Sequence, residues 1–295
     1  MREWQIGDPV DGTTDGWMDA QNWGHGREDE KDEGTPSRNR SSNPKRDEYS
    51  NRAWDLYQDF KEEEALRYIN MALDLDSKNA NNWNRKAIIL EALERYSESE
   101  ECYIKSNELE YSYIVCDNRA RMLYRWASRL IEDAKKSHDP LRILEDAKSI
   151  CTRAMQSLPG DKSEENIEKY LKLYDTVNFY MEYENKYLKN IETVRKYPKE
   201  ELFTITGRNF QKHVPLHQGM SLKLVREPDN EFDSDAIAVY AGDEKVGYVA
   251  NNPHTKFEMT STASELKDSF SDRAEYLCYL ERYTQVQFPI GRIIR

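Results

Sequence analysis

The hydrophobic period of the sequence changes once, and this change constrains the fold more than any other feature. From Asp47 to Pro198 the apolar residues recur with a helical period, whereas after Glu201 they alternate as they do in strands. A chain of 295 residues is long enough for two domains. We therefore predict an α + β multidomain protein, with a helical domain at 48–198 followed by a β domain at 201–295.

Residues 1–47 show neither period. They are rich in Gly, Asp, Ser and Asn and include a run of charged residues from Arg27 to Glu33, so we predict a disordered acidic tail. Three of the six tryptophans of the chain lie there: Trp4, Trp17 and Trp23. They are either incidental or part of a linear motif that docks into a pocket on a partner or on this chain.

The helical region contains an internal repeat of 34 residues. Small or apolar residues recur at this spacing in four pairs, Ala53 with Ala87, Ala65 with Ser99, Ile69 with Tyr103, and Ala72 with Ser106. Small residues at such positions allow two antiparallel helices to approach closely. The pattern resembles the tetratricopeptide repeat (TPR), although Ser77 stands where that family usually has proline. The resemblance implies a helical solenoid that binds proteins.

A third unit departs from this spacing. Ala147, Cys151, Ala154 and Pro159 match the second half of a repeat, but they lie about 14 residues too late. We expect the insertion at the helix–helix turn near 135–140, after a long first helix at 113–134. A final helix from Glu164 to Tyr197, with one apolar face, ends at Pro198. It is expected to cap the solenoid.

The alternating region predicts a small barrel, closed or partly open. Short strands and a hairpin signal at Ala241-Gly242-Asp243 are typical of that architecture. The expected strands are Leu202–Thr206, Ser221–Val225, Asp235–Tyr240, Lys245–Ala250, Glu275–Leu280 and Val286–Ile293. We also expect one helix beside the barrel, from Thr255 to Lys267.

One motif in this region is specific. Arg226-Glu227-Pro228-Asp229-Asn230-Glu231-Phe232-Asp233 is followed by Ala236-Ile237-Ala238-Val239 and by Val246-Gly247-Tyr248. The run resembles the HIRAN domain, a small β-barrel related to OB folds. The best-studied members of that family hold the free 3′ end of single-stranded DNA. The resemblance covers roughly residues 201–295 and implies the same fold here.

The resemblance also implies a set of DNA-binding residues. In DNA-binding members of that family, two aromatic side chains flank the terminal bases, and a carboxylate with polar neighbours reads the 3′-hydroxyl. The implied residues are Arg208, Asn209, Phe210, Asn230, Phe232, Asp233 and Tyr248. Asn209 departs from the family, where DNA-binding members can have a cation, and the adjacent Arg208 could substitute for it.

A structural interpretation of the same residues stays open. Phe232 and Tyr248 could be barrel core, and Asn230 and Asp233 could bond the backbone of their own turn, as such residues do readily. The charge of the region favours this alternative, because 201–295 contains 11 Lys and Arg against 14 Asp and Glu, a net charge of −3. A domain that binds along a nucleic-acid backbone usually has a basic face. DNA binding would therefore require a small local site.

The first helices of the repeats offer a second candidate site. Asn81, Asn84, Arg85 and Ile88 are expected to face the concave side. Some TPR proteins hold the C-terminal carboxylate of a chaperone with a Lys/Asn/Arg clamp, which these residues match only faintly because the lysines are missing. The groove could equally pack against the tail or the barrel of the same chain.

The sequence gives little reason to expect an enzyme. It has no phosphate-binding Gly-x-x-x-x-Gly-Lys, no H-E-x-x-H pair and no G-x-G-x-x-G after a strand. His213 and His217 are four apart, but Pro215 lies between them. We expect no metal site and no cofactor.

Cysteine usage and hydropathy bear on the compartment. Cys102, Cys116, Cys151 and Cys278 have no paired spacing, which favours free thiols in a reducing cytoplasm. The chain has neither an apolar run long enough for a membrane span nor a secretory signal at its first residues.

The sequence thus predicts a cytoplasmic, non-enzymatic adaptor. Its TPR-like region would bind an unknown protein, and its HIRAN region would bind a single-stranded DNA 3′ end, at sites of DNA repair or replication-fork processing. The alternative is a protein-interaction scaffold without DNA binding. Exposure of Phe210, Phe232 and Tyr248 in an open site would favour the first, and their burial the second.

Overall fold

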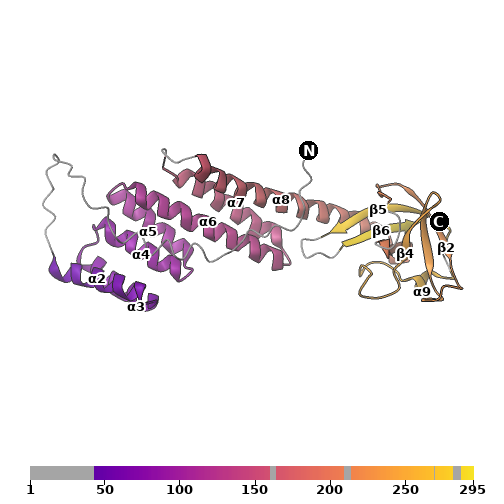
Figure 1. The fold of residues 1–295 in the computed structure, drawn as a ribbon, viewed down its shortest axis with the longest axis horizontal. Helices are drawn as coiled ribbons and strands as arrows, with labels where there is room; N and C mark the ends of the chain where they lie inside the picture. Colours follow the sequence, from indigo (N-terminus) through magenta and orange to yellow (C-terminus); the bar gives the residue numbers. More distant parts are fainter. Residues whose placement is uncertain (1–42, 160–163, 209–213, 269, 282–286) are drawn as a thin grey trace. The chain divides into compact units, whose positions relative to one another are not determined.

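The structure is a computed structural model, and it describes residues 43–159, 164–208, 214–268, 270–281 and 287–295. Its long helices all precede its first strand, as the change of period predicts (Figure 1). The helices of the first part are α2 (Pro44–Gln58), α3 (Glu62–Leu75), α4 (Ala80–Ala92), α5 (Tyr96–Leu109), α6 (Tyr113–Lys136), α7 (Pro140–Ser157) and α8 (Glu164–Val194). The disordered tail was predicted for residues 1–47. Of these, 1–42 lie outside the described residues, and 44–47 are the first residues of α2 and are helical.

The repeat of 34 residues places equivalent side chains in one continuous core. All eight residues of the four pairs are buried: Ala53, Ala65, Ile69, Ala72, Ala87, Ser99, Tyr103 and Ser106. Where the second unit has serine in place of alanine, the hydroxyl is satisfied by the neighbouring helix. Ser99 Oγ donates to the Ala87 carbonyl at 2.8 Å, and Ser106 Oγ donates to the Ala80 carbonyl at 2.8 Å. The helix pairs α2–α3, α4–α5 and α6–α7 form a TPR-like solenoid.

The third unit is longer because its helices are longer. Helix α6 has 24 residues against 13 in α4, and α7 has 18 against 14 in α5. The turns at 93–95 and 137–139 are equally short, so the prediction of an insertion in the turn was wrong. Without Gly or Pro inside it, α6 continues as a helix. Ile131 and Ala134 extend its buried face.

Helix α8 is unbroken over 31 residues and leads to the β region. Near its end, Ile191 and Val194 pack in one apolar cluster with Leu202, Leu277 and other barrel residues. The amide of Asn190 donates to the Tyr279 carbonyl at 3.0 Å. A 3-10 turn, η1 (Lys199–Glu201), follows Pro198 and precedes the first strand.

Among the described residues, no helix combines the length and the hydropathy of a membrane span.

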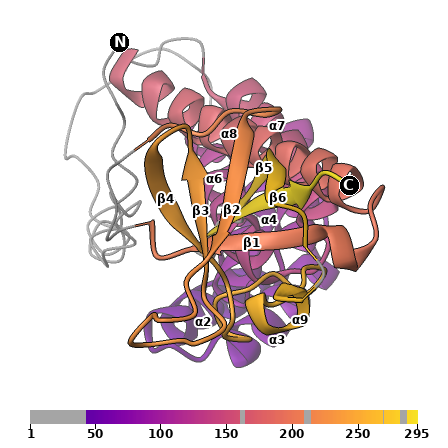
Figure 2. The ribbon, with the colours of Figure 1, turned by 90° about the vertical axis from the view of Figure 1, so that its right-hand side faces the viewer.

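Six strands close into a barrel in the order β1-β4-β3-β2-β5-β6, with β6 returning to β1 (Figure 2). They are β1 (Leu202–Thr206), β2 (Ser221–Arg226), β3 (Ile237–Ala241), β4 (Glu244–Val249), β5 (Arg273–Glu281) and β6 (Gln287–Ile293). The strand predictions are confirmed to within two residues at each end. Inward-facing residues such as Ile205, Leu224, Ile237 and Val239 form the barrel core.

The predicted helix from Thr255 to Lys267 was wrong in extent, because only α9 (Ala263–Leu266) is helical. The preceding residues form turns and hydrogen bonds to β1 in place of a continuous helix. The Phe257 N–H donates to Thr204 Oγ1 at 2.9 Å, and the Ser261 N–H donates to the Leu202 carbonyl at 2.8 Å. Thr262 then caps α9 in a reciprocal pair of hydrogen bonds with Glu265.

Candidate functional site

The turn between β2 and β3 is organised by the side chain of Asn230. Its Oδ1 accepts from the backbone N–H of Phe232 at 3.0 Å and from that of Asp233 at 3.2 Å. Its Nδ2 donates to Glu227 Oε2 at 3.3 Å. An amide oxygen that accepts two backbone N–H groups fixes the local chain path. Asn230 is therefore a structural residue of the turn, as the alternative interpretation expected.

Phe232 lies on this turn with its ring in solvent. The residue is 95% exposed, the highest value among the exposed large hydrophobic residues of the described chain. An isolated exposed apolar residue is common on proteins. Here, however, Asn230 holds the backbone N–H of Phe232, so the ring projects from a defined point of the turn. Phe232 is not barrel core, and that part of the structural interpretation is wrong.

The carboxylate of Asp233 is held at both oxygens. Oδ1 accepts from the Asp235 N–H at 2.9 Å, and Oδ2 accepts from Asn251 Nδ2 at 2.9 Å. Asp233 is only partly buried. A carboxylate offers about four lone-pair positions, so both oxygens retain capacity for a further donor. The side chain therefore stabilises the turn and can still accept a hydrogen bond from a ligand.

Tyr248 on β4 joins the turn to the barrel wall. Its hydroxyl donates to Glu227 Oε2 at 3.0 Å, and Lys245 Nζ donates to Glu227 Oε1 at 2.5 Å and to the Tyr248 hydroxyl at 3.1 Å. Burial alone would raise the pKa of Glu227, but the hydrogen bonds from Lys245, Tyr248 and Asn230 lower it overall. Burial alone would lower the pKa of Lys245, but its hydrogen bonds to Glu227 and Tyr248 raise it. This network fixes Tyr248, which is half-buried with one ring face near Lys245.

The segment after β1 runs beside Tyr248. A Cβ on Gly207 would lie 3.8 Å from Tyr248 Cδ2. The next residue, Arg208, donates from a terminal guanidinium nitrogen to the Val214 carbonyl at 2.9 Å. The predicted site residues Asn209 and Phe210 lie outside the described residues. The structure thus brings Asn230, Phe232, Asp233 and Tyr248 together and places Arg208 just after β1.

Three residues that the sequence analysis did not select belong to the same site. Glu227 and Lys245 position Tyr248, and Asn251 positions Asp233. Glu227 lies inside the motif already singled out, and Lys245 immediately precedes Val246-Gly247-Tyr248. The proximity of Asn251 to Asp233 depends on the pairing of β3 with β4 and had no sequence signal.

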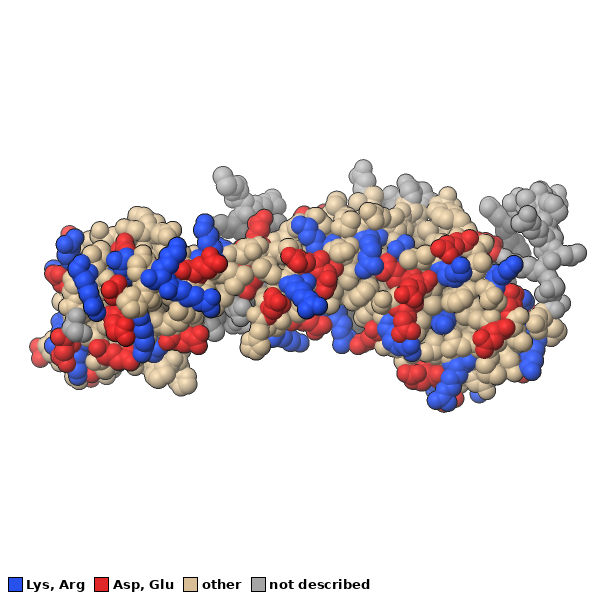
Figure 3. Space-filling view, turned by 180° about the vertical axis from the view of Figure 1, so that it is seen from behind, with Lys and Arg blue, Asp and Glu red and all other residues tan. Residues whose placement is uncertain are grey.

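The charges of the described surface are mixed. On the face shown in Figure 3, Lys and Arg side chains alternate with Asp and Glu, and no continuous basic band is visible there. Many charges of the described residues, on whichever face they lie, are paired, for example Lys267 with Asp235 at 3.0 Å and Lys199 with Glu265 at 2.8 Å. A ligand of the candidate site would therefore be recognised locally.

The predicted groove residues of the repeats are largely engaged with neighbouring helices. Arg85 donates to Ser50 Oγ at 2.8 Å and to the Ser50 carbonyl at 3.1 Å, and its guanidinium lies over the Trp54 ring. Burial lowers the pKa of Arg85. Asn84 Oδ1 accepts from Asn118 Nδ2 at 3.3 Å. Asn81 is exposed, and Ile88 is half-buried against the core.

The sequence analysis missed the continuation of this surface on α6. Arg121 donates to Asn118 Oδ1 at 2.6 Å, and Arg125 pairs with Glu91 at 3.0 Å. Asn84 with Asn118 and Glu91 with Arg125 are each 34 apart, so the repeat spacing itself could have identified them. This polar surface joins α4 to α6 and leaves Arg125 accessible on one side.

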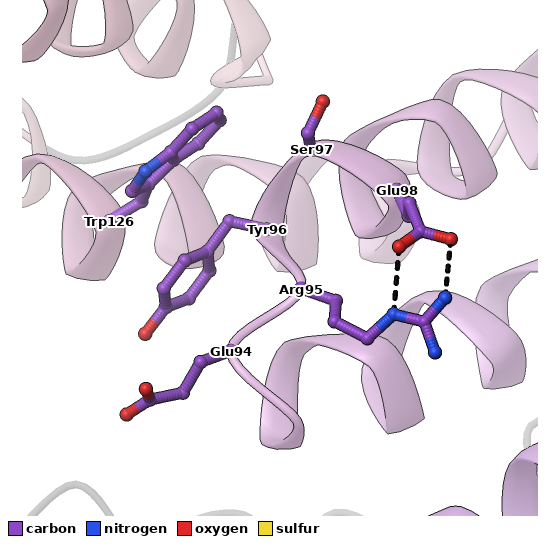
Figure 4. Close-up of a pocket in the computed structure, with 6 residues that line it drawn as sticks. All are labelled: Glu94, Arg95, Tyr96, Ser97, Glu98 and Trp126. Atoms are coloured by element: carbon purple, nitrogen blue, oxygen red, sulfur yellow. Dashed lines mark hydrogen bonds and ion pairs between the residues drawn. The ribbon is translucent and has the colours of Figure 1, made fainter.

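A hollow of about 280 Å³ lies at the turn between α4 and α5 (Figure 4). The rings of Tyr96 and Trp126 stack with their centroids 5.8 Å apart. Arg95 points away from them and forms two hydrogen bonds of 2.7 Å with Glu98. Glu94 is paired with Arg129. The charged side chains of this hollow are thus paired with one another or with a neighbouring helix.

A second hollow of about 370 Å³ lies between α4 and α5 and includes Cys102. Burial raises the pKa of the Cys102 thiol to about 11, so the reactive thiolate is scarce. All four cysteines are free; three are buried and Cys116 is partly exposed. Within the described ranges, no three His, Cys, Asp or Glu side chains are grouped to hold a metal ion.

The comparison with known protein families agrees with the assignment of the β region. Residues 200–253 match the HIRAN domain, a range that contains β1 to β4 and the described site residues. The match confirms the resemblance seen in the motif. No curated protein matches the chain.

Solved structures similar to the helical region are distant. The translocator chaperone SycD of Yersinia enterocolitica type III secretion is 14% identical, with 45% of this chain and 83% of that chain covered and a TM-score of 0.32. The second TPR domain of human RPAP3, solved with an HSP70 peptide, is 17% identical, with 44% and 92% covered and a TM-score of 0.29. A type III secretion complex from Aeromonas hydrophila is 16% identical, with 48% and 81% covered and a TM-score of 0.30.

Proposed function

We propose that the barrel binds the 3′-hydroxyl end of single-stranded DNA at the surface formed by Phe232, Asp233 and Tyr248. The observation that carries the proposal is the exposed ring of Phe232, on a backbone that Asn230 holds in place, beside the anchored carboxylate of Asp233. A base can stack on the ring without regard to sequence, for about 1–3 kcal/mol. The HIRAN match supports the same function.

The carboxylate supplies selectivity for the chemical state of the end. A terminal 3′-hydroxyl donates a hydrogen bond to Asp233, whereas a terminal 3′-phosphate brings like charge close to it. Glu227 is less suited to this role, because its charge is paired with Lys245 at 2.5 Å and its Oε2 already accepts from both Tyr248 and Asn230. Recognition by one carboxylate and one or two aromatic rings needs no basic groove, so it suits a domain with a net charge of −3.

In this proposal the chain is an adaptor and not an enzyme. The TPR-like helices bind a protein through the surface that includes Asn81, Asn84, Arg85 and Ile88, now extended by Asn118 and Arg125 on α6. Because Arg85 and Asn84 hold neighbouring helices, the accessible Arg125 and Asn81 are the better contacts for a partner.

We also place the protein in the reducing cytoplasm, where its free thiols would persist. Its process in this proposal is DNA repair or replication-fork processing, where free 3′ ends arise.

The alternative function is a protein scaffold without DNA binding. One observation favours it: both oxygens of Asp233 already accept hydrogen bonds within the turn. In that case Phe232 would be an aromatic anchor for a protein.

A competition experiment separates the two. The protein is bound to a fluorescent linear single strand, and unlabelled linear or circular single strands of the same composition compete at equal nucleotide concentration. End recognition predicts that the linear competitor displaces the probe and the circular one does not. Equal displacement by both, or no binding of the probe, would refute the proposal and leave the scaffold.

A further inference from the structure

Four outward-facing residues form one row across adjacent strands of the barrel. Lys223 on β2 is paired in register with Arg273 on β5 and, on its other side, with Tyr240 on β3. Tyr240 is in turn paired with Lys245 on β4. The row therefore runs Arg273, Lys223, Tyr240, Lys245, with an aromatic ring between two lysines.

Two members of the row are cations that face each other without compensation. Lys223 and Arg273 are exposed, and neither side chain has a hydrogen-bonding or ion-pair partner within the described part of the chain. Like charges directly opposite each other on adjacent strands destabilise a sheet. By contrast, Lys245 is neutralised by Glu227 at 2.5 Å. A sequence with more acids than bases here could readily have supplied a partner for Lys223 or Arg273.

The nearest acid on the same face of β5 does not compensate the pair. Glu275 is two residues from Arg273, so it points to the same side of the strand. Its carboxylate is taken by Arg292 of β6 at 3.2 Å. The row thus keeps a local positive charge in a domain that is acidic as a whole.

The row leads to the candidate site. Glu227 follows β2 directly, and its N–H donates to the Ala236 carbonyl at 2.9 Å, so the extended pairing continues to it. Lys223 and Glu227 are four residues apart, so their side chains lie on the same face. Four residues of strand span about 13 Å, a distance of a few nucleotides. Glu227 contacts Tyr248, and Lys245 contacts both. A single strand of DNA whose last base stacks on Phe232 can therefore follow the outer face of the barrel toward Lys223 and Arg273.

We infer that Lys223 and Arg273 bind the phosphodiester backbone of the nucleic acid whose 3′ end occupies the candidate site. Tyr240, between Lys223 and Lys245, provides an apolar surface along the same path. This inference rests on the proposed end recognition and adds the course of the strand beyond it. Binding of phosphates gives Lys223 and Arg273 the opposite charges that the described residues of the chain do not supply.

The test compares a short and a long ligand. Thymidine dinucleotide and a thymidine strand of about twelve nucleotides, both with a 3′-hydroxyl, are titrated at several salt concentrations. The variant is Lys223→Gln/Arg273→Gln. The control is Arg195→Gln/Lys196→Gln, which removes the same charge from exposed residues at the end of the helical region.

We expect unchanged binding of the dinucleotide in both double variants, because it reaches only the end site. For the long strand, the Lys223/Arg273 variant should bind about tenfold more weakly at low salt. Its slope of log K against log salt should be smaller by about 1.4, the value for two lost phosphate contacts on a single strand. The control should match the wild type.

An unchanged slope, or an equal loss in the control, would overturn the inference. Failure of the proposed end recognition is a separate outcome, seen as no binding of the dinucleotide and equal binding of linear and circular strands by the wild type. The row is then judged on the circular strand alone, by whether the variant reduces the salt slope. Thermal unfolding of both variants verifies that they are folded.

Discussion

The side-chain amide of Asn251 donates to Asp233 Oδ2 at 2.9 Å, across the space between the end of β4 and the β2–β3 turn. The Asp235 N–H holds the other oxygen at 2.9 Å. The carboxylate is thus oriented before a ligand arrives, which reduces the ordering cost of binding. Asn251 therefore positions the residue that, in the proposed function, reads the 3′-hydroxyl.

Asp233→Asn should abolish discrimination between chemical states of the DNA end. The substitution preserves the shape of the side chain and removes its negative charge, so a 3′-phosphate is no longer repelled. We expect the ratio of affinities for 3′-hydroxyl and 3′-phosphate strands to fall to about one. Asn251→Ala should weaken binding to the hydroxyl end by a smaller factor and keep the preference, because the charge remains. Unchanged discrimination in Asp233→Asn would show that another group reads the end.

Phe232→Ala should weaken DNA binding without changing stability. The ring is 95% exposed, so its removal should alter the free energy of unfolding by less than about 0.5 kcal/mol. Loss of one stacked base should weaken binding by about 1–3 kcal/mol. Tyr111→Ala, which removes a ring that is 63% exposed in the helical region, is the matched control and should bind normally. Binding and urea denaturation curves measure the two effects, and an equal effect of both substitutions would argue against stacking on Phe232.

The hydrogen bonds to Glu227 predict a dependence of stability on pH. Although burial opposes it, the hydrogen bonds from Lys245, Tyr248 and Asn230 hold the pKa of Glu227 below its usual value of 4.5 in the folded state. The unfolded state then takes up the proton first as the pH falls, so the contribution of Glu227 is complete above 4.5 and is lost below it.

Glu227→Gln should accordingly be less stable than the wild type near neutral pH, and the difference should shrink as the pH falls below 4.5. Melting temperatures measured across the acid range give this difference directly. Glu231→Gln removes an exposed carboxylate of the same turn without removing these hydrogen bonds, so it serves as the control. A constant difference between Glu227→Gln and the wild type would contradict the assigned role.

Gly247 should be intolerant of any side chain. Its φ is +152°, and a Cβ there would lie 2.4 Å from the Thr206 carbonyl oxygen and 2.9 Å from Ile205 Cγ2. Because the clash is with the backbone of β1, Gly247→Ala should cost about 3 kcal/mol or more. Gly242→Ala is the control: its φ is +60° but its Cβ position is open, so a cost of about 1 kcal/mol is expected. Similar urea midpoints for the two variants would show that β4 can move away from β1.

Sequence periodicity predicted the order of helices and strands, but it did not predict the two segments that depart from the regular pattern. The repeat of 34 residues identified Ala53, Ala87, Ile69 and Tyr103 as buried positions because the helices pack with regular small and large residues. It misplaced the insertion of the third unit, because an added helical segment and an added loop give the same shift in spacing. The helix predicted from Thr255 failed because hydrogen bonds to Thr204, distant in sequence, fix that segment.

The candidate site was predicted where it depends on a local motif. Asn230, Phe232 and Asp233 lie within one turn, so their proximity follows from the sequence. The exposure of Phe232 and the hydrogen bonds to both Asp233 oxygens could not be predicted from the sequence, because they depend on the pairing of strands and on Asn251. The same holds for Lys223 and Arg273, which are 50 apart in sequence and face each other only through the register of β2 and β5.

The most direct test of the account is the affinity for two short single strands that differ only at the 3′ end. Fluorescence anisotropy at low salt compares a strand ending in a 3′-hydroxyl with one ending in a 3′-phosphate. The account predicts tighter binding to the hydroxyl end by about tenfold or more, because the hydroxyl donates a hydrogen bond to a charged acceptor whereas the phosphate is repelled by it. Equal affinity for the two strands, or no binding to either, would contradict end recognition by Asp233.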